Sequence, residues 1–395
     1  MPAHGKDGAG ARIAYYRSAT RPKLTQRQLA DAAHVSLGTI RKIERGERVP
    51  SDATLDALGR ALGVDPSLLL GDRGPTRTRV HEALPSLSAA LATYDLPEEG
   101  PVRPLAELRT AVAEASRWRL AAQYTPIAAA LPDLLVELTR AHHAVPVAER
   151  SESAALLVRA CRSADAVAFK FGAHDLSARL VELMRWAAAE ADDPLLAASV
   201  AYVRAETFFA ARAHSAGLRA LERSLDAAPA PSTSAAIAAK GALHMRAAVM
   251  AGRAGDGSSA VTHLREARAL AARLSEGIYC GTAFGPDSVN VHEVSVAVSL
   301  GGAHVARALD IAAVWRPPGD MPAERRSGFY IELARAQLWS GLSDDAFASL
   351  KQARHIAPQH TREHPWVRED AAVLRRLKRA GSEALTNFAE WCAAI

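Results

Sequence analysis

Residues 24–46 read LTQRQLADAAHVSLGTIRKIERG and decide how the N-terminal part of the chain folds. Thr25 followed by Gln28 three residues later is a capping-box pattern, which predicts the start of one short helix. Ser36 is a favoured N-cap for a second helix, and Gly46 is a favoured residue just past its end. The side chains expected to pack between the two helices are Leu29, Ala30, Val35, Ile40 and Ile43.

The second of these helices would present a small, basic face to solvent. Its outward positions are Leu37, Gly38, Arg41 and Lys42. Two short helices joined by a tight turn, with such a face on the second, have the form of a helix-turn-helix, whose second helix enters the DNA major groove. The alternative is an α-helical hairpin within a larger helical core.

The spacing L-T-Q-x-x-L-A…V-S-x-x-T-I-x-x-I-E-x-G resembles that of Xre-type, repressor-like DNA-binding domains, over about Gly8 to Leu70. The resemblance implies a phosphate contact from Gln26, base reading near Leu37, Gly38 and Lys42, and an ion pair between Arg17 and Glu44. Since Gly38 has no side chain, its neighbours or DNA shape must supply readout there. The candidate DNA-binding residues are Gln26, Arg27, Ser36, Leu37, Gly38, Thr39, Arg41, Lys42 and Arg45.

Charge is distributed unevenly along the chain. Residues 1–50 contain ten Lys and Arg and four Asp and Glu, a net charge of +6, whereas all 395 residues together carry +5. The remaining residues therefore sum to −1. Positive charge confined to the helix-turn-helix region is what neutralisation of DNA phosphates requires.

Bulk composition predicts a globular cytoplasmic protein, and the predicted DNA-binding head would place it at the nucleoid. Hydrophobic residues make up 49% of the chain, yet no run of 18 apolar residues is present, so we expect no membrane span. The N-terminus, MPAHGKDGAG, lacks the apolar segment of a signal peptide. The three cysteines, Cys161, Cys280 and Cys392, lie far apart and predict neither a disulfide framework nor a zinc site.

The predicted organisation is all-α, with three regions. Residues 1–72 form a five-helix DNA-binding domain, including helices over Ala9–Arg17, Ala53–Leu62 and Ser67–Leu70. Residues 73–104 form a linker, with a helix over Thr76–Tyr94 that Pro85 either kinks or begins. The Pro-rich segment LPEEGPVRP at 96–104 then marks the boundary before the large domain. Residues 105–395 are rich in Ala, Leu and Arg with helical periodicity and almost no alternation typical of strands.

Small residues recur at fixed spacings in this large region. The spacing of Ala205, Gly217, Leu221 and Pro229 is repeated by Ala334, Ala346, Leu350 and Pro358, and in part by Ala248, Ala260 and Leu264. Gly255, Gly301 and Gly341 each precede an alanine by five positions. This ladder is typical of tetratricopeptide repeats, in which small side chains let two helices pack closely, and it predicts a superhelix with a concave face.

Further segments resemble bacterial regulators that join an Xre-type head to a tetratricopeptide-like sensor: YTPIAAALPDLLVEL (124–138), FKFGAHDLSARLVELMRWAA (169–188), GTAFGPDSVNVHEVSVAV (281–298) and QHTREHPWVRED (359–370). The resemblance implies a dimeric transcriptional regulator that binds a roughly palindromic operator and responds to an effector. Candidate effector-binding residues are Tyr202, Glu206, Phe209, Met245, Asn290, His292 and Arg335. Peptide-pheromone receptors of similar architecture tend to hold the peptide backbone with asparagines of the first helix of each repeat. Because the only asparagines here are Asn290 and Asn387, we expect a small organic effector rather than an extended peptide.

Other functions remain as alternatives. The repeats could bind a partner protein while the head only tethers them to DNA. His360-Thr-Arg-Glu363-His364 matches the H-x-x-E-H metalloprotease pattern, but Pro358 and Pro365 bracket it and favour a loop. Other catalytic motifs are missing, so we expect no enzymatic activity, no metal and no cofactor. At the N-terminus of the predicted helix 288–300, Asp287 or Ser288 is expected to serve as the cap.

Overall fold

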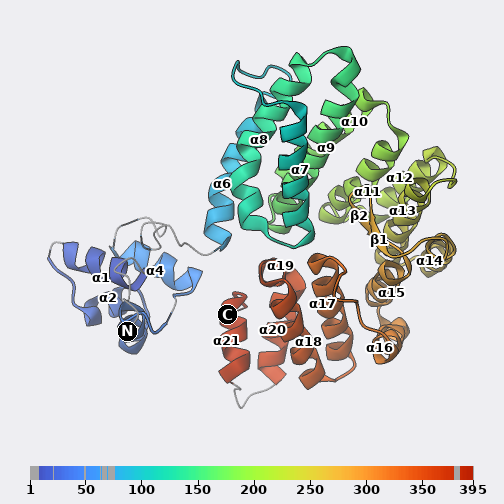
Figure 1. Cartoon of the computed structure of the whole chain (residues 1–395). Coiled ribbons are helices and arrows are strands. Elements are labelled where there is room, and N and C mark those ends of the chain that lie inside the picture. The colour runs from blue at the N-terminus through green and yellow to red at the C-terminus, as the bar shows by residue number, and fades with distance from the viewer. Residues whose placement is uncertain are drawn as a thin grey trace.

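The computed structural model describes residues 9–20, 22–48, 50–62, 64, 69, 76–377 and 383–394. Over these ranges the regular secondary structure is helical apart from one short hairpin, which confirms the predicted all-α class (Figure 1). The head comprises α1 (Ala9–Ala19), α2 (Gln26–Ala32), α3 (Leu37–Glu44) and α4 (Asp52–Leu62). The helix expected over Ser67–Leu70 falls outside the described residues, apart from Leu69.

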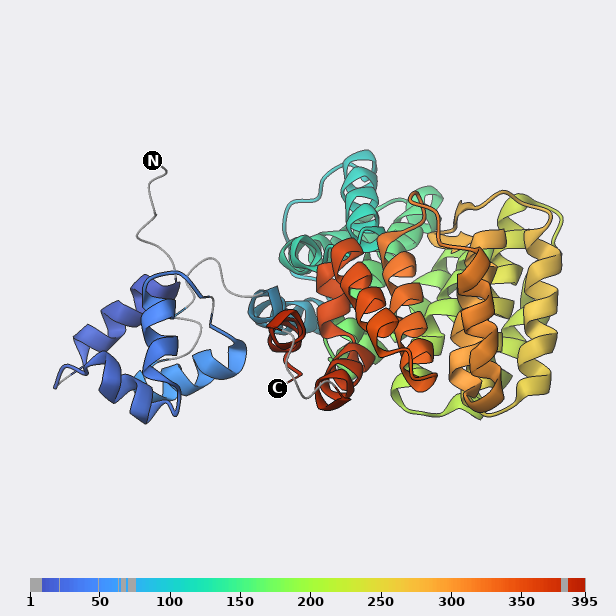
Figure 2. The same ribbon diagram turned by 90° about the horizontal axis from the view of Figure 1, so that it is seen from below.

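The head has a hydrophobic core of its own. Its fully buried side chains come from α1, α2, α3 and α4, with Leu69 packed among them: Ile13, Leu29, Ile40, Ile43, Leu55 and Leu58. None of the residues in this cluster belongs to the clusters of the body. Figure 2 shows the head as a separate small bundle beside the larger domain.

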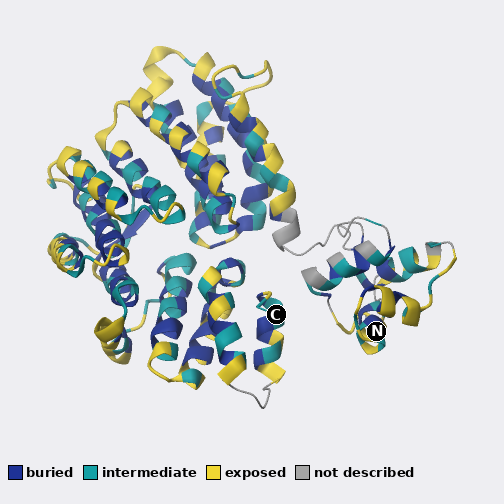
Figure 3. Ribbon diagram, turned by 180° about the vertical axis from the view of Figure 1, so that it is seen from behind, coloured by how far each residue is buried: buried dark blue, intermediate teal, exposed yellow. Residues whose placement is uncertain are grey.

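The body consists of successive helices that wind into a ring (Figure 1). They are α6 (Thr76–Ala92), α7 (Leu105–Leu120), α8 (Tyr124–Ala144), α9 (Val147–Lys170), α10 (His174–Ala191), α11 (Pro194–Ala210), α12 (His214–Ala227), α13 (Ser234–Arg253), α14 (Gly257–Ala271), α15 (Pro286–Leu300), α16 (Val305–Val314), α17 (Ala323–Trp339), α18 (Ser343–Ile356), α19 (Pro358–Glu363), α20 (Pro365–Leu377) and α21 (Glu383–Trp391). Figure 3 shows buried residues concentrated where neighbouring helices meet.

The first of these helices packs as part of the body. Val80, Leu87 and Leu91 of α6 lie in the same hydrophobic cluster as the buried residues of α7 to α14. We expected a linker over residues 73–104, but the apolar face of α6 is buried against the body, and the Pro-rich segment 96–104 is a loop between α6 and α7. Pro85 lies inside α6 at an exposed position.

The small-residue ladder does pack helices in pairs. In the α11–α12 pair, Ala205 and Gly217 are buried, and a Cβ atom on Gly217 would lie 2.8 Å from Cβ of Phe208. A real Cβ atom never comes this close, so only glycine fits there. Gly255 and Gly341 end the first helix of a pair with φ of +78° and +79°, the left-handed conformation that favours glycine.

The two ends of the body meet and close the ring. The side-chain oxygen of Gln359 in α19 accepts hydrogen bonds from the backbone N–H groups of Tyr124 and Thr125, at 2.7 and 3.3 Å. Nearby, Lys170 of α9 forms a 2.9 Å ion pair with Glu324 of α17. Figure 1 shows the α19–α20 end facing the α7–α9 end. These contacts join residues about 150 to 235 positions apart in sequence.

A β-hairpin that the sequence pattern did not predict projects between α14 and α15. Its strands, β1 (Gly277–Tyr279) and β2 (Thr282–Phe284), pair antiparallel with Ile278 opposite Ala283. Phe284 is fully buried against α13, where a Cβ atom on Gly241 would lie 2.0 Å from its ring. The hairpin is anchored because glycine leaves room for this aromatic ring.

The hairpin also caps the helix that follows it. We expected Asp287 or Ser288 to cap α15, but the N-cap is Gly285, which has no side chain. Instead, the carboxylate of Glu276 accepts hydrogen bonds from the N–H of Ser288 at 3.0 Å and from its hydroxyl at 2.5 Å. Asp287 accepts a hydrogen bond from the indole of Trp315. The cap is therefore supplied from across the loop, which sequence spacing does not reveal.

A substitution in the head can test how closely α1 and α3 must approach each other. A Cβ atom on Gly10 would lie 2.0 Å from the carbonyl oxygen of Ile43, a backbone atom that cannot rotate away. We expect Gly10→Ala to destabilise the head by about 2 kcal/mol or more, because the two helices must separate. Urea unfolding of residues 1–75, which contain a separate core, measures this effect.

Gly38→Ala is the matched control. Its added Cβ atom meets only Ser36 Oγ, at 3.8 Å, and Gly38 lies inside α3. Replacing a helical glycine by alanine should therefore stabilise the head by about 0.5–1 kcal/mol. Equal unfolding midpoints for Gly10→Ala and the unsubstituted head would contradict the close packing described here.

Candidate functional site

The second helix of the head, α3, is fixed at both its start and its inner face. Ser36 accepts a hydrogen bond from the N–H of Thr39 at 3.0 Å, as predicted for the N-cap. Ile40 and Ile43 are buried, whereas Arg41 and Lys42 are exposed on the opposite side. The helix thus presents two cations on a rigid support, which suits contact with DNA.

The predicted pair between Arg17 and Glu44 is confirmed. Arg17 donates two hydrogen bonds to the Glu44 carboxylate, at 2.7 and 2.9 Å, and Gln26 donates a third at 2.7 Å. This hydrogen bonding to Glu44 outweighs desolvation and raises the pKa of Arg17. One carboxylate therefore ties α1, the start of α2 and the end of α3 together. The amide of Gln26, expected to contact a phosphate, donates to Glu44.

The other candidate DNA-binding residues differ in how they are held. Arg27 and Gly38 are exposed, while Leu37 is half-buried against the head core. The hydroxyl of Thr39 lies 2.9 Å from that of Ser36. Arg45 forms a 2.9 Å ion pair with Glu47, and both are well exposed. A surface pair of this kind is weak, so Arg45 can exchange it for a phosphate at little cost.

Several candidate effector residues of the body do come together. The hydroxyl of Tyr202 accepts a hydrogen bond from Arg325, whose guanidinium also lies 3.2 Å from Nε2 of His292. Arg246 lies over the Tyr202 ring at 4.2 Å and pairs with Glu206 at 3.4 Å. Burial would raise the pKa of Tyr202, but the neighbouring arginines outweigh it and lower that pKa.

The remaining candidates have different surroundings. Phe209 is half-buried between Arg246 and Arg253, at 5.7 and 5.1 Å from its ring. Arg335 is bound by both Asp370, at 2.8 Å, and Glu369, at 2.6 Å. Met245 is fully buried in the hydrophobic core, and Asn290 is half-buried. The structure therefore groups Tyr202, Glu206, Phe209 and His292, and places Met245 and Arg335 among other partners.

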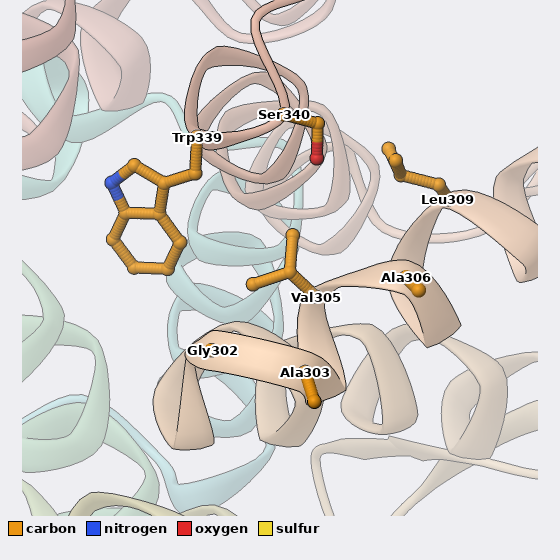
Figure 4. Close-up of a pocket in the computed structure, with 7 residues that line it drawn as sticks. All are labelled: Gly302, Ala303, Val305, Ala306, Leu309, Trp339 and Ser340. Atoms are coloured by element: carbon orange, nitrogen blue, oxygen red, sulfur yellow. The ribbon is translucent and has the colours of Figure 1, made fainter.

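A pocket of about 370 Å³ lies elsewhere, between the start of α16 and the end of α17 (Figure 4). It is lined mainly by small and apolar residues: Gly302, Ala303, Val305, Ala306, Leu309, Trp339 and Ser340. None of the candidate effector residues borders it. The predicted residues and this pocket are separate features.

The H-x-x-E-H segment forms α19 and its end. The ring of His360 hydrogen-bonds Ser327 at 2.7 Å and lies 3.3 Å from Lys170. Burial and Lys170 lower the pKa of His360 to about 3, so its ring is neutral. Glu363 accepts from Arg368 at 2.8 Å. In the part of the chain that the structure describes, no group of three or more His, Cys, Asp or Glu side chains could hold a metal ion.

Comparison with known proteins identifies the head. A helix-turn-helix family model matches residues 21–69. The transcriptional regulator ClgR of Mycobacterium tuberculosis, from strains H37Rv and CDC 1551, is 36% identical over 90 residues, which cover 22% of this chain and 80% of ClgR. The chain belongs to the Xre-type helix-turn-helix family of transcriptional regulators.

One solved structure is similar to a larger part of the regulator. The crystal structure of Bacillus thuringiensis PlcR in complex with the peptide PapR7 and DNA covers 67% of this chain and 94% of PlcR, with 13% identity and a TM-score of 0.27. Such a distant likeness does not transfer the ligand of PlcR to this regulator.

None of the helices described here combines the length and apolarity that crossing a bilayer requires.

Sequence reasoning missed the arginines that surround Tyr202 from other helices. They are Arg162 of α9, Arg246 of α13 and Arg325 of α17, which contact its ring or hydroxyl, and Arg119 of α7, which hydrogen-bonds the nearby hairpin. The sequence did indicate that two of these arginines have partners outside their own helices, since neither Arg119 nor Arg325 has an acidic residue three or four positions away. An arginine without such a neighbour cannot form a helical ion pair on its own helix.

The buried carboxyl group of Glu332 in α17 makes the stability of the folded chain depend on pH. Ser295 donates to one carboxylate oxygen at 2.7 Å, and the other oxygen is buried without a partner. Burial raises its pKa from 4.5 to about 7, although Ser295, Arg253, Arg325 and Lys170 oppose the shift. The folded chain therefore holds a proton that the unfolded chain releases, and stability falls as the pH rises from about 4.5 to 7.

We expect Glu332→Gln to remove this dependence, because the amide still accepts from Ser295 and carries no charge. The shift is equivalent to at most about 3 kcal/mol by linkage. In thermal unfolding at pH 5 and pH 8, the midpoint of Glu332→Gln relative to that of the unsubstituted protein should be higher at pH 8 than at pH 5. Glu149→Gln, at an exposed position of α9, is the control. Parallel pH curves for Glu332→Gln and the unsubstituted protein would contradict the shift.

Proposed function

We propose that this regulator binds a roughly palindromic operator as a homodimer and responds to a small molecule held in its helical body. The observation that carries the proposal is the exposed pair Arg41 and Lys42 on a capped and packed α3, within a segment of net charge +6. Such a surface can anchor on phosphates and reach base edges at the same time.

Dimerisation follows from the size of one head. A head with a single recognition helix covers one half-site, and two half-sites read by a two-fold dimer lie about 34 Å apart, one turn of DNA. A body that holds two heads at this spacing raises the effective concentration of the second head. An effector that favours one arrangement of the bodies would then change operator affinity through head spacing.

The body has features of a sensor in addition to those of a scaffold. Tyr202, Glu206 and His292 come from α11 and α15 and meet arginines of α13 and α17 in the interior of the ring. A purely structural solenoid would place apolar residues there, because buried charges cost free energy. This polar interior is why we favour a small molecule over a partner protein bound to the outer surface.

Selection of bound DNA from random sequence would yield the operator and test the proposal directly. A recovered palindrome with half-sites one turn apart supports it. Affinity for the recovered operator should fall steeply with salt, with a log–log slope of about −5 for six phosphate contacts. No enrichment of any sequence, together with a flat salt response, would overturn the proposal.

Substitutions in α3 should separate reading from anchoring. Arg41 and Lys42 lie about 100° apart around the helix, so only one can point squarely into the groove. We expect Lys42→Ala to cost about 1–3 kcal/mol on the operator and much less on scrambled DNA, because lysine can donate to guanine. Arg41→Ala should weaken both duplexes equally and reduce the salt slope by about 1. Equal losses on both duplexes for Lys42→Ala would assign it to anchoring.

Removal of the body tests the dimer. Residues 1–75 contain the separate head core and should fold, but should bind the full operator weakly and without cooperativity. Gel-shift titrations of this fragment and of the full chain make the comparison. Tight, cooperative binding by the fragment alone would show that the body does not provide the dimer contacts.

A further inference from the structure

Five arginines lie near one another in the body, and we call them the central arginine cluster: Arg119 of α7, Arg162 of α9, Arg246 and Arg253 of α13, and Arg325 of α17. Arg119 and Arg162 are buried, Arg246 and Arg325 are half-buried, and Arg253 is exposed. Contacts connect them through the rings of Tyr202 and Phe209 and through the hairpin. Arg162 and Arg246 lie 5.8 and 4.2 Å from the ring centroid of Tyr202, and Arg325 donates to its hydroxyl.

Two members of the cluster are satisfied only by neutral groups of the hairpin tip and its neighbours. Arg119 donates to the carbonyl of Gly281 at 2.8 Å. Arg162 donates to the carbonyl of Cys280 at 3.0 Å and to the hydroxyl of Thr282 at 2.7 Å. Both side chains are more than nine-tenths buried, at 8% and 9% exposure. Carbonyl oxygens accept these hydrogen bonds but leave the positive charges uncompensated.

Nearby carboxylates do not neutralise the positive charge of the cluster. Within the described ranges, Glu206 is the only carboxylate at ion-pair distance from any of the five, 3.4 Å from Arg246. Glu324, the other acid near Arg119 and Arg325, is paired with Lys170. Burial raises the pKa of Asp165 well above its usual value, and that of Glu332 to about 7. Five guanidinium groups therefore face about one free negative charge.

Some hydrogen-bond donors of the cluster also have no acceptor. The Nε atoms of Arg119 and Arg246 are buried and have no hydrogen-bond partner. Arg253, which is exposed, lies between the rings of Phe209 and Trp366, 5.1 Å from each, with no carboxylate at ion-pair distance among the described residues. Leaving the buried donors of Arg119 and Arg246 unpaired costs free energy, which an anion with several oxygens would recover.

We propose that the central arginine cluster is the effector site and that the effector is a small anion bearing carboxylate or phosphate groups. This inference rests on the proposed sensory role of the body. Arginine binds both groups through pairs of parallel hydrogen bonds, and the rings of Tyr202 and Phe209 hold the guanidinium planes in place. The hairpin tip already occupies Arg119 and Arg162, which leaves Arg246, Arg253 and Arg325 for a compact ligand rather than an extended chain.

The experiment measures binding to the full chain in the absence of DNA. Citrate, pyrophosphate and a metabolite extract split on an anion-exchange resin are added at matched ionic strength, with potassium chloride as reference. We expect citrate, pyrophosphate or the retained fraction to raise the thermal midpoint in a saturable way, and the unretained fraction to have no effect. A random heptapeptide pool with amidated C-termini tests the extended-peptide alternative.

Substitutions test whether the anion binds at the central arginine cluster. Arg246→Gln and Arg253→Gln, each shown to be folded by circular dichroism, should weaken binding of the active anion at least tenfold. Arg185→Gln, at an exposed ion pair of α10, should leave it unchanged and corrects for general salt effects on stability. Equal binding by all three variants, a response only to the unretained fraction or the peptides, or no response at all would overturn the anion site.

Operator binding separates this inference from the proposed function. An anion that binds through the cluster but leaves operator affinity unchanged supports the site and contradicts its sensory role. Release of DNA by the unretained fraction supports sensing and contradicts the anion site.

Discussion

Charge buried inside the ring constrains the rest of the body. Guanidinium groups have very high pKa values and remain charged, so each must find acceptors within the fold or from a ligand. Here burial lowers the pKa of Arg162 to about 9, and the hairpin supplies carbonyl oxygens to it and to Arg119. The hairpin in turn depends on Gly241, which leaves room for Phe284. A helical solenoid therefore contains a short β element whose backbone carbonyl oxygens accept hydrogen bonds from two buried arginines.

The head follows a different principle, in which one carboxylate organises three helices. Glu44 accepts hydrogen bonds from Arg17 and Gln26 and so fixes the end of α3 against α1 and α2. The exposed side chains of α3 are then held by packing beneath them rather than by contacts among themselves. The head core is separate from the clusters of the body, so the two parts can change relative position without either one unfolding.

Local patterns predicted much of this fold. The caps at Thr25 and Ser36, the buried positions of α2 and α3, and the small-residue ladder all depend on neighbours close in sequence or on helical periodicity. The hairpin, the cap from Glu276 and the packing of α6 depend on contacts between distant segments, which no local pattern reports. The candidate effector residues Tyr202, Glu206 and Phe209 lie on one helix, α11, but their arginine partners come from helices as far as 123 residues away in sequence.

Closure of the ring changes how the body responds to unfolding. In an open repeat array each unit touches only its neighbours, so the ends fray first and the array can lose units one at a time. In this body Gln359 of α19 binds the backbone at Tyr124 of α8, and Lys170 of α9 binds Glu324 of α17, so helices near the two ends of the array support each other. Opening either end removes support from the other. The closed array should therefore lose its structure in one cooperative step, and such long-range contacts should make its folding slow.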